Sequence, residues 1–186
     1  LEGKSVLLVG VGAIGSAFAV KAKALGMQIT GIRRRTNRPH QHIDLLIPSD
    51  DLPVHLPKAD FVVITAPLTE ETHNLFGPSE LAAMNNQGYL INVGRGGIVD
   101  EEALYEALVA GPEGGGIAGA GLDVFSEEPL PPDARIRSAP NLVITPHYAG
   151  WTSDYDTKVW PLFVENARRY HAGKDLLSVV DPVLGY

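Results

Sequence analysis

The feature that most constrains the fold of this chain is a glycine motif at residues 10–15. It reads Gly-Val-Gly-Ala-Ile-Gly, follows a segment at 4–9 that is apolar from residue 6 onward, and precedes an apolar, helix-forming run to residue 25. A second apolar stretch follows at 27–32. A strand, a glycine turn, a helix and a second strand within about 30 residues form the unit that binds dinucleotides in α/β proteins. The alternative is a structural glycine turn in an α/β protein that binds no nucleotide.

Each position of the motif has a separate physical task. Gly10 permits the sharp turn off the strand, and Gly12 lets the backbone approach a pyrophosphate, because a Cβ atom there would collide with it. Gly15 lets the helix pack closely on the strand. Ala13 and Ile14 begin the helix, whose free N–H groups attract phosphate.

The rest of the chain alternates between short apolar runs and helix-forming segments. Strands are predicted at 4–9, 28–32, 61–64, 89–93, 117–124 and 142–144, and helices at 13–25, 50–56, 79–84, 100–109 and 151–172. Ser79 and Asp100 are the predicted N-caps of two helices, and Pro161 should bend the last helix or mark its true start. The alternation without an internal repeat predicts the class α/β, a doubly wound parallel sheet.

Polar and glycine-rich loops follow the predicted strands. In such sheets ligands bind beyond the carboxyl ends of the strands. We therefore expect one edge of the sheet to gather the loops at 10–15, 33–35, 65–68, 94–97, 123–129 and 145–150.

Composition excludes several classes of protein. The 186 residues suffice for one sizeable core and leave little for two full domains. A net charge of −7 disfavours a nucleic-acid partner. The absence of cysteine excludes disulfides and fits a reducing compartment, so we expect a cytoplasmic protein. The apolar run at 6–20 is too short and glycine-rich for a membrane span, and no residues have metal-ligand spacing.

Three consecutive arginines follow the second strand. Seventeen residues separate Gly15 from Arg33, where a carboxylate would bind the ribose 2′-hydroxyl of NAD. Arg33, Arg34 and Arg35 instead suit a 2′-phosphate, to which guanidinium groups form bidentate bonds. We therefore predict a preference for NADP, with NAD possible as cofactor. The alternative is a solvated basic loop without cofactor contact.

Five motifs in order carry a family resemblance. They are Gly10–Gly15, the Pro-Leu-Thr-Glu-Glu-Thr at 67–72, the Ile-Asn-Val-Gly-Arg-Gly at 91–96, the Gly-Leu-Asp-Val-Phe at 121–125 with Glu128-Pro129, and the Thr-Pro-His-Tyr-Ala-Gly at 145–150. Together they resemble the nucleotide-binding part of the D-isomer-specific 2-hydroxyacid dehydrogenases, which include glyoxylate/hydroxypyruvate reductases. The resemblance implies a Rossmann-type NAD(P)-binding domain that serves hydride transfer between NADP(H) and a 2-keto or D-2-hydroxy acid.

The resemblance also assigns roles to residues. His147 would exchange the proton, Glu128 would orient its ring, and Arg95 would bind the substrate carboxylate and polarise the carbonyl. Asp123 would lie near the nicotinamide carboxamide. The residues expected to bind the cofactor are Gly10, Gly12, Ala13, Ile14, Gly15, Arg33, Arg34, Arg35, Ala66, Pro67, Thr72, Val93, Gly94, Arg95, Asp123, His147 and Gly150.

The chain departs from the family in two respects: it opens directly on the first nucleotide-binding strand, and its glycine-rich stretch at 111–116 is longer than the usual connection. We expect a dinucleotide-binding domain at 1–172 and a tail at 173–186 that would return to a substrate domain whose N-terminal segment is absent. Such a chain should bind the dinucleotide but turn over poorly. The family suggests a homodimer and a small 2-keto acid substrate. A dinucleotide sensor resembling the family's corepressors remains an alternative, whereas the order of Arg95, Glu128 and His147 argues against another Rossmann enzyme.

Overall fold

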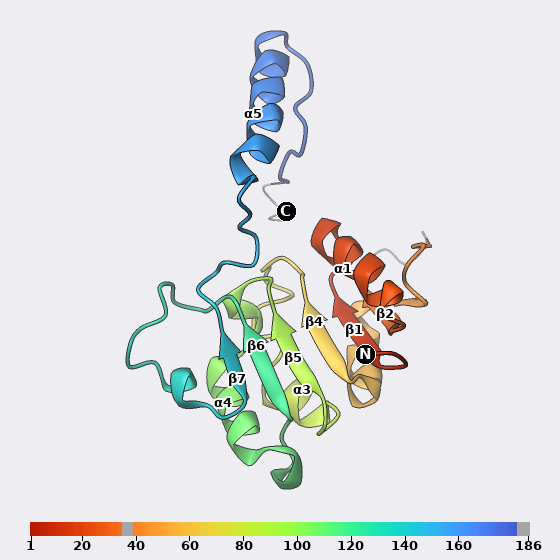
Figure 1. The fold of residues 1–186 in the computed structure, drawn as a ribbon, viewed down its shortest axis with the longest axis vertical. Helices are drawn as coiled ribbons and strands as arrows, with labels where there is room; N and C mark the ends of the chain where they lie inside the picture. Colours follow the sequence, from red (N-terminus) through yellow and green to blue (C-terminus); the bar gives the residue numbers. More distant parts are fainter. Residues whose placement is uncertain (35–38, 182–186) are drawn as a thin grey trace. The chain divides into compact units, whose positions relative to one another are not determined.

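The computed structural model describes residues 1–34 and 39–181, and the chain divides into two compact units, Leu1–His147 and Tyr148–Tyr186. The first unit contains a parallel sheet flanked by helices (Figure 1). Its strands are β1 (Ser5–Val9), β2 (Gln28–Ile32), β3 (Leu45–Ile47), β4 (Phe61–Ile64), β5 (Tyr89–Asn92), β6 (Gly119–Leu122) and β7 (Leu142–Ile144).

The strand order is β3-β2-β1-β4-β5-β6-β7, and every pair is parallel. The chain therefore builds outward from β1 to one side and from β4 to the other. This confirms the predicted doubly wound sheet, and it puts the switch point, where such sheets bind ligands, between β1 and β4. The edge strand β3, which has three residues, was not predicted from the sequence.

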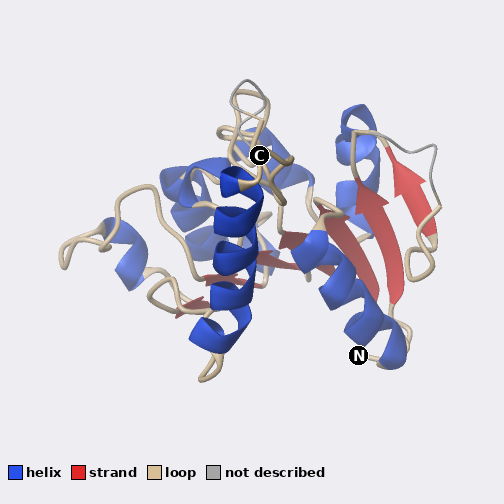
Figure 2. Ribbon diagram, turned by 90° about the horizontal axis from the view of Figure 1, so that it is seen from above, coloured by secondary structure: helices blue, strands red, loops and turns tan. Residues whose placement is uncertain are grey.

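Helices cover both faces of the sheet (Figure 2). They are α1 (Ala13–Ala24), α2 (Leu52–His55), α3 (Pro78–Ala83) and α4 (Glu101–Ala110). Successive residues of a strand point to opposite faces. Val6 and Leu8 accordingly share a buried cluster with alanines of α1, whereas Leu7 and Val9 share a larger cluster with leucines of α2, α3 and α4. Burial on both faces explains the unbroken apolar runs of the central strands.

The helix ends follow local rules, with one correction. Asp100 caps α4 as predicted, because its Oδ1 accepts hydrogen bonds from the amides of Glu102 and Ala103, both at 3.0 Å. The prediction that Ser79 caps the preceding helix is wrong. The helix α3 begins at Pro78, with Gly77 as N-cap, because proline suits the first helical position, where no N–H is needed.

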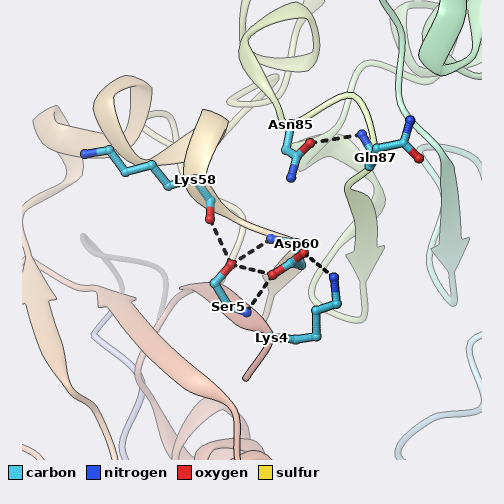
Figure 3. A network of polar contacts seen from close by, with 6 residues as sticks. All are labelled: Lys4, Ser5, Lys58, Asp60, Asn85 and Gln87. Atoms are coloured by element: carbon cyan, nitrogen blue, oxygen red, sulfur yellow. Dashed lines mark hydrogen bonds and ion pairs between the residues drawn. The ribbon is translucent and has the colours of Figure 1, made fainter. Parts of the chain in front are cut away.

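The amino ends of β1 and β4 are joined by a polar network (Figure 3). The Asp60 carboxylate accepts hydrogen bonds from the Lys4 ammonium (2.9 Å) and from the amide and hydroxyl of Ser5 (both 2.8 Å). The Ser5 hydroxyl lies 2.8 Å from the Lys58 carbonyl as well, and it accepts the Asp60 amide at 3.0 Å. This network lies at the end of β1 opposite to the glycine motif.

The second unit consists of α5 (Tyr155–His171) and the segments that flank it. The helix begins four residues after the predicted Trp151, and Pro161 lies inside it rather than at its start. Several apolar side chains of α5 are exposed, among them Trp160 and Phe163, whose rings meet edge to face. The predicted domain at 1–172 includes α5 and stays a prediction. Among the described residues, no helix is both long and apolar enough to cross a membrane.

Candidate cofactor-binding and catalytic site

The glycine motif forms the turn between β1 and α1, and its three glycines differ in their surroundings. Gly10 has a φ of +99°, and a Cβ atom there would lie 2.6 Å from the amide nitrogen of Ala66. A Cβ atom on Gly15 would overlap the Gly10 carbonyl oxygen and lie 2.9 Å from the Thr65 hydroxyl. Gly12 has no neighbouring atom within 4 Å of that position. Gly10 and Gly15 are thus required by the fold itself, whereas Gly12 leaves open space.

The first turn of α1 suits an anion. Gly12 is its N-cap and has no side chain to satisfy the first amides, and this turn contains no acidic residue. The first N–H groups of a helix lack intrahelical acceptors and carry partial positive charge. Ile14 is exposed in this turn. The open space at Gly12 and the uncapped helix start fit the pyrophosphate of a dinucleotide.

The loop after β4 packs against the glycine turn. The Thr65 hydroxyl donates to the Gly10 carbonyl at 2.6 Å. Further along, the Thr72 hydroxyl donates to the Pro67 carbonyl at 2.8 Å and accepts the Thr69 amide at 2.7 Å. Thr72 therefore shapes this loop, and its predicted contact with the cofactor stays a prediction.

The carboxyl edge of the sheet continues as a row of backbone hydrogen bonds beyond the strands. In each bond, the first residue after one strand donates its amide to the last residue of the neighbouring strand, at 2.8–3.3 Å. The pairs are Arg33 to Ile47, Gly10 to Ile32, Thr65 to Val9, Val93 to Ile64, Asp123 to Asn92 and Thr145 to Leu122. The structure therefore brings the predicted loops to one edge, as expected.

The basic loop after β2 lies close to the loop after β4. The guanidinium of Arg34 is 3.9 Å from the Glu71 carboxylate, and both side chains are exposed. Arg33 is half-buried. The predicted contact of Arg35 lies outside the described residues. Arg33 and Arg34 therefore follow β2 at the position that faces the ribose in dinucleotide-binding sheets.

The predicted catalytic carboxylate and imidazole are in direct contact. Glu128 Oε2 lies 2.6 Å from Nδ1 of His147, and its Oε1 accepts the Phe125 amide at 2.9 Å. Burial raises the pKa of Glu128 and is the largest single influence. The hydrogen bonds from His147 and Phe125, with the charges of His147 and Arg95, together outweigh it and hold this pKa below its ordinary value.

The state of Glu128 determines which ring nitrogen carries hydrogen. An ionised carboxylate only accepts hydrogen bonds, so Nδ1 of His147 is the donor. Nε2 is then the nitrogen that can gain and lose a proton. The charge of Arg95 acts on Glu128, so the three predicted catalytic residues share one electrostatic environment.

Asn92, which was not predicted as a site residue, holds the loop of Arg95. Asn92 is 1 % exposed, its Oδ1 accepts the Gly94 amide, and its Nδ2 donates to the Arg95 carbonyl, both at 3.0 Å. The Arg95 guanidinium in turn donates to the Gly94 carbonyl at 2.7 Å. A Cβ atom on Gly94 would lie 2.7 Å from the Ala66 carbonyl oxygen. A polar residue at the end of an apolar strand was the available signal.

Asp123 is buried and anchors the segment that follows β7. It is 4 % exposed, its Oδ1 accepts the Thr145 hydroxyl at 2.5 Å, and its carbonyl accepts the His147 amide at 2.8 Å. The predicted contact with a carboxamide stays a prediction. Gly150 belongs to the second unit, so its predicted cofactor contact also stays a prediction. Over residues 1–34 and 39–181, no group of three His, Asp or Glu side chains could hold a metal ion.

Comparisons with known proteins agree with this geometry. Residues 1–149 match the family described as D-isomer specific 2-hydroxyacid dehydrogenase, NAD binding domain. A glyoxylate reductase of Korarchaeum cryptofilum is 37 % identical over 175 residues, which cover 92 % of this chain and 50 % of that protein. A glyoxylate/hydroxypyruvate reductase B of Pectobacterium carotovorum is 39 % identical over 181 residues, covering 96 % of this chain and 55 % of that protein. The chain thus spans about half the length of these relatives.

Solved structures are similar over nearly the whole chain. A D-isomer specific 2-hydroxyacid dehydrogenase of Xanthobacter autotrophicus, in complex with NADPH and MES, has a TM-score of 0.88 and 36 % identity, covering 98 % of this chain and 73 % of that one. An NADPH-dependent glyoxylate/hydroxypyruvate reductase of Sinorhizobium meliloti, in complex with NADP and sulfate, has a TM-score of 0.87 and 31 % identity, covering 100 % of this chain and 58 % of that one. The chain therefore belongs to the D-isomer specific 2-hydroxyacid dehydrogenase family, and residues 1–149 are its NAD binding domain.

Proposed function

We propose that the protein carrying this chain reduces a small 2-keto acid to a D-2-hydroxy acid with NADP(H), and that this chain supplies the cofactor-binding part. The observation that carries the proposal is the 2.6 Å contact between His147 and Glu128 at the sheet edge that also presents the glycine motif and Arg95. Relatives named glyoxylate and hydroxypyruvate reductases support the substrate class, and they do not favour the sensor alternative.

The residues divide the work as follows. A bound nicotinamide dinucleotide supplies the hydride. The open space at Gly12 and the start of α1 would hold its pyrophosphate. His147 gives a proton from Nε2 to the substrate carbonyl oxygen and takes it back in the oxidation direction. Glu128 keeps the ring oriented through Nδ1, and Arg95 binds the substrate carboxylate and polarises the carbonyl.

Arg33 and Arg34 support a preference for NADP over NAD. Guanidinium groups bind a 2′-phosphate, and no carboxylate occupies the position of Arg33. The Xanthobacter and Sinorhizobium structures contain NADPH and NADP. Titration of the protein with NADPH and NADH, for the wild type and for an Arg33→Ala/Arg34→Ala double variant, tests the preference. Tighter binding of NADH by the wild type would contradict it.

The decisive experiment for the activity is a panel of glyoxylate, hydroxypyruvate, pyruvate and bulkier 2-keto acids, assayed with both nicotinamides on the protein that carries this chain rather than on residues 1–186 alone. The variants Arg95→Met, Glu128→Gln and His147→Asn should lose turnover and retain NADPH binding. Tight NADPH binding with negligible turnover of every acid by the wild type would instead support a dinucleotide sensor. A homodimer, measured by light scattering, and a cytoplasmic location, which the cysteine-free sequence favours, complete the proposal.

A further inference from the structure

The segment from Thr145 to His147 is tied to the neighbouring strand end at both of its own ends. The Thr145 amide donates to the Leu122 carbonyl at 2.9 Å, and its hydroxyl donates to Asp123 Oδ1 at 2.5 Å. Two residues on, the His147 amide donates to the Asp123 carbonyl at 2.8 Å. One residue, Asp123, thus receives both the side chain of Thr145 and the backbone of His147.

The path between these two ties leaves little freedom. Pro146 has no N–H and a fixed φ, and it restricts the residue before it. His147 has a φ of +54°, in the left-handed region that non-glycine residues seldom adopt. Such a conformation persists where surrounding contacts hold it, and it is frequent at functional sites. Asp123 is buried, whereas Thr145 and His147 are exposed. A buried residue thus holds the backbone that carries the exposed imidazole.

From this arrangement we propose that Thr145 is a positioning residue for proton transfer at His147, acting through Asp123. The proposal rests on the proposed function of His147. The Thr145 hydroxyl holds the side chain of Asp123, and the backbone carbonyl of Asp123 accepts the His147 amide. Glu128 orients the His147 ring. Loss of the hydroxyl removes one donor from a buried carboxylate and loosens one end of the three-residue path.

The test, made on the protein that carries this chain, compares Thr145→Val, which removes the hydroxyl at nearly constant volume, with Thr145→Ser, which keeps it. A displacement of about 1 Å of a reacting group can cost 100-fold in rate, so we expect Thr145→Val to lower kcat about 10- to 100-fold. NADPH binding and the KM for the keto acid should change little. The primary isotope effect with deuterated NADPH should rise, because the chemical step becomes rate-limiting. Thr145→Ser should restore most of kcat.

A matched control is Thr157→Val on α5. The Thr157 hydroxyl donates to the Asp154 carbonyl at 2.7 Å, and no predicted site residue lies on that helix. This variant should keep the wild-type kcat. Thermal unfolding of all variants separates positioning from stability, because a positioning role predicts a loss of kcat without a matching loss of melting temperature.

Two outcomes overturn the inference. One is a wild-type kcat and isotope effect in Thr145→Val; the other is an equal loss in Thr145→Val and Thr145→Ser that follows a fall in melting temperature. The proposed function has its own indicator, His147→Asn. If that variant keeps full activity, the assignment of His147 fails, whereas an inactive His147→Asn beside a fully active Thr145→Val rejects only the role of Thr145.

Discussion

Replacement of Asp60 by asparagine removes the negative charge of the carboxylate that Lys4 and Ser5 contact at the amino ends of β1 and β4. The hydrogen bond from Lys4 is the largest cause that lowers the pKa of Asp60, followed by that from the Ser5 amide. Burial opposes them, and the Ser5 hydroxyl and the charge of Lys4 add to them, so that the pKa falls from 3.8 to about 2. The ionised form is therefore the one that the folded protein stabilises.

The pKa sets a ceiling on the free energy involved. A fall from 3.8 to about 2, at about 1.36 kcal/mol for each unit of pKa, corresponds to at most about 2.4 kcal/mol of folding stability. The side chain of Asp60 is 26 % exposed and that of Lys4 is 55 % exposed, so solvent screens the interaction. Exposed pairs of this kind contribute about 1 kcal/mol or less, and the two Ser5 bonds add to this. We expect Asp60→Asn to cost about 1–2 kcal/mol near neutral pH.

The sign of the pH dependence follows from the lowered pKa. The stabilisation is fully present above pH 3.8, the ordinary value, and is lost as the pH falls through about 2. Urea unfolding of the wild type and Asp60→Asn, measured from neutral pH down to about pH 2, should show a difference that shrinks with acidification. The exposed Asp133 provides the control, because Asp133→Asn should change stability little at any pH.

Two results would refute this reasoning: equal stability of the two proteins at neutral pH, or a difference that stays constant into acid. NADPH binding should be unchanged in Asp60→Asn, because the network lies at the opposite end of β1 from Gly10.

Three further predictions concern the carboxyl edge. Asn92→Leu leaves the Gly94 amide without its buried acceptor and should lower the free energy of urea unfolding by about 1–3 kcal/mol. It should also raise the KM for the keto acid. Unchanged stability would contradict the role of this side chain. Gly15→Ala forces α1 away from the Gly10 carbonyl and should lower the free energy of unfolding by about 1–3 kcal/mol. Gly12→Ala should lower it by about 1 kcal/mol or less and still weaken NADPH binding, measured by fluorescence titration. Equal free energies of unfolding for the two variants would count against the distinction. Glu128→Gln should lower kcat about 100-fold or more at unchanged NADPH affinity, because a neutral amide stabilises a protonated imidazole poorly; wild-type kcat would exclude the orienting role.

The fold was predictable where sequence pattern and burial coincide. The run at 61–64 became β4 with the same bounds, because a strand covered on both faces is apolar throughout. Local pattern did not identify β3, which has only three residues and pairs with β2 alone at the edge of the sheet. The start of α5 was placed too early, because Thr152, Ser153 and Asp154 are residue types that favour caps and turns, and the helix begins after them at Tyr155.

The site was predictable as residue types and less so as contacts. The pairing of His147 with Glu128 followed from the family resemblance, and the structure gives its distance. The task of Thr145 was not visible, because it depends on Asp123 from the loop after a different strand. Asn92 acts on Gly94 and Arg95 in its own loop, so a polar residue at the end of an apolar strand was a local signal for it. The hydroxyl of Thr72 is engaged by its own loop, a contact that its motif did not indicate, and its predicted cofactor contact stays a prediction.

The row of backbone bonds beyond the strands has a consequence for how such a protein can diversify. Each site loop leaves the sheet from a residue whose amide is hydrogen-bonded to the adjacent strand, so all of these loops start at the same level along the strands. Side chains in the loops can be exchanged, and the loops can be lengthened, without shifting the starting points of the neighbouring loops. A one-residue deletion inside a strand would instead offset its loop against both flanking ones and invert which side chains face the core. Changes in the loops can therefore alter the site, whereas the number of residues in each strand is constrained by its neighbours.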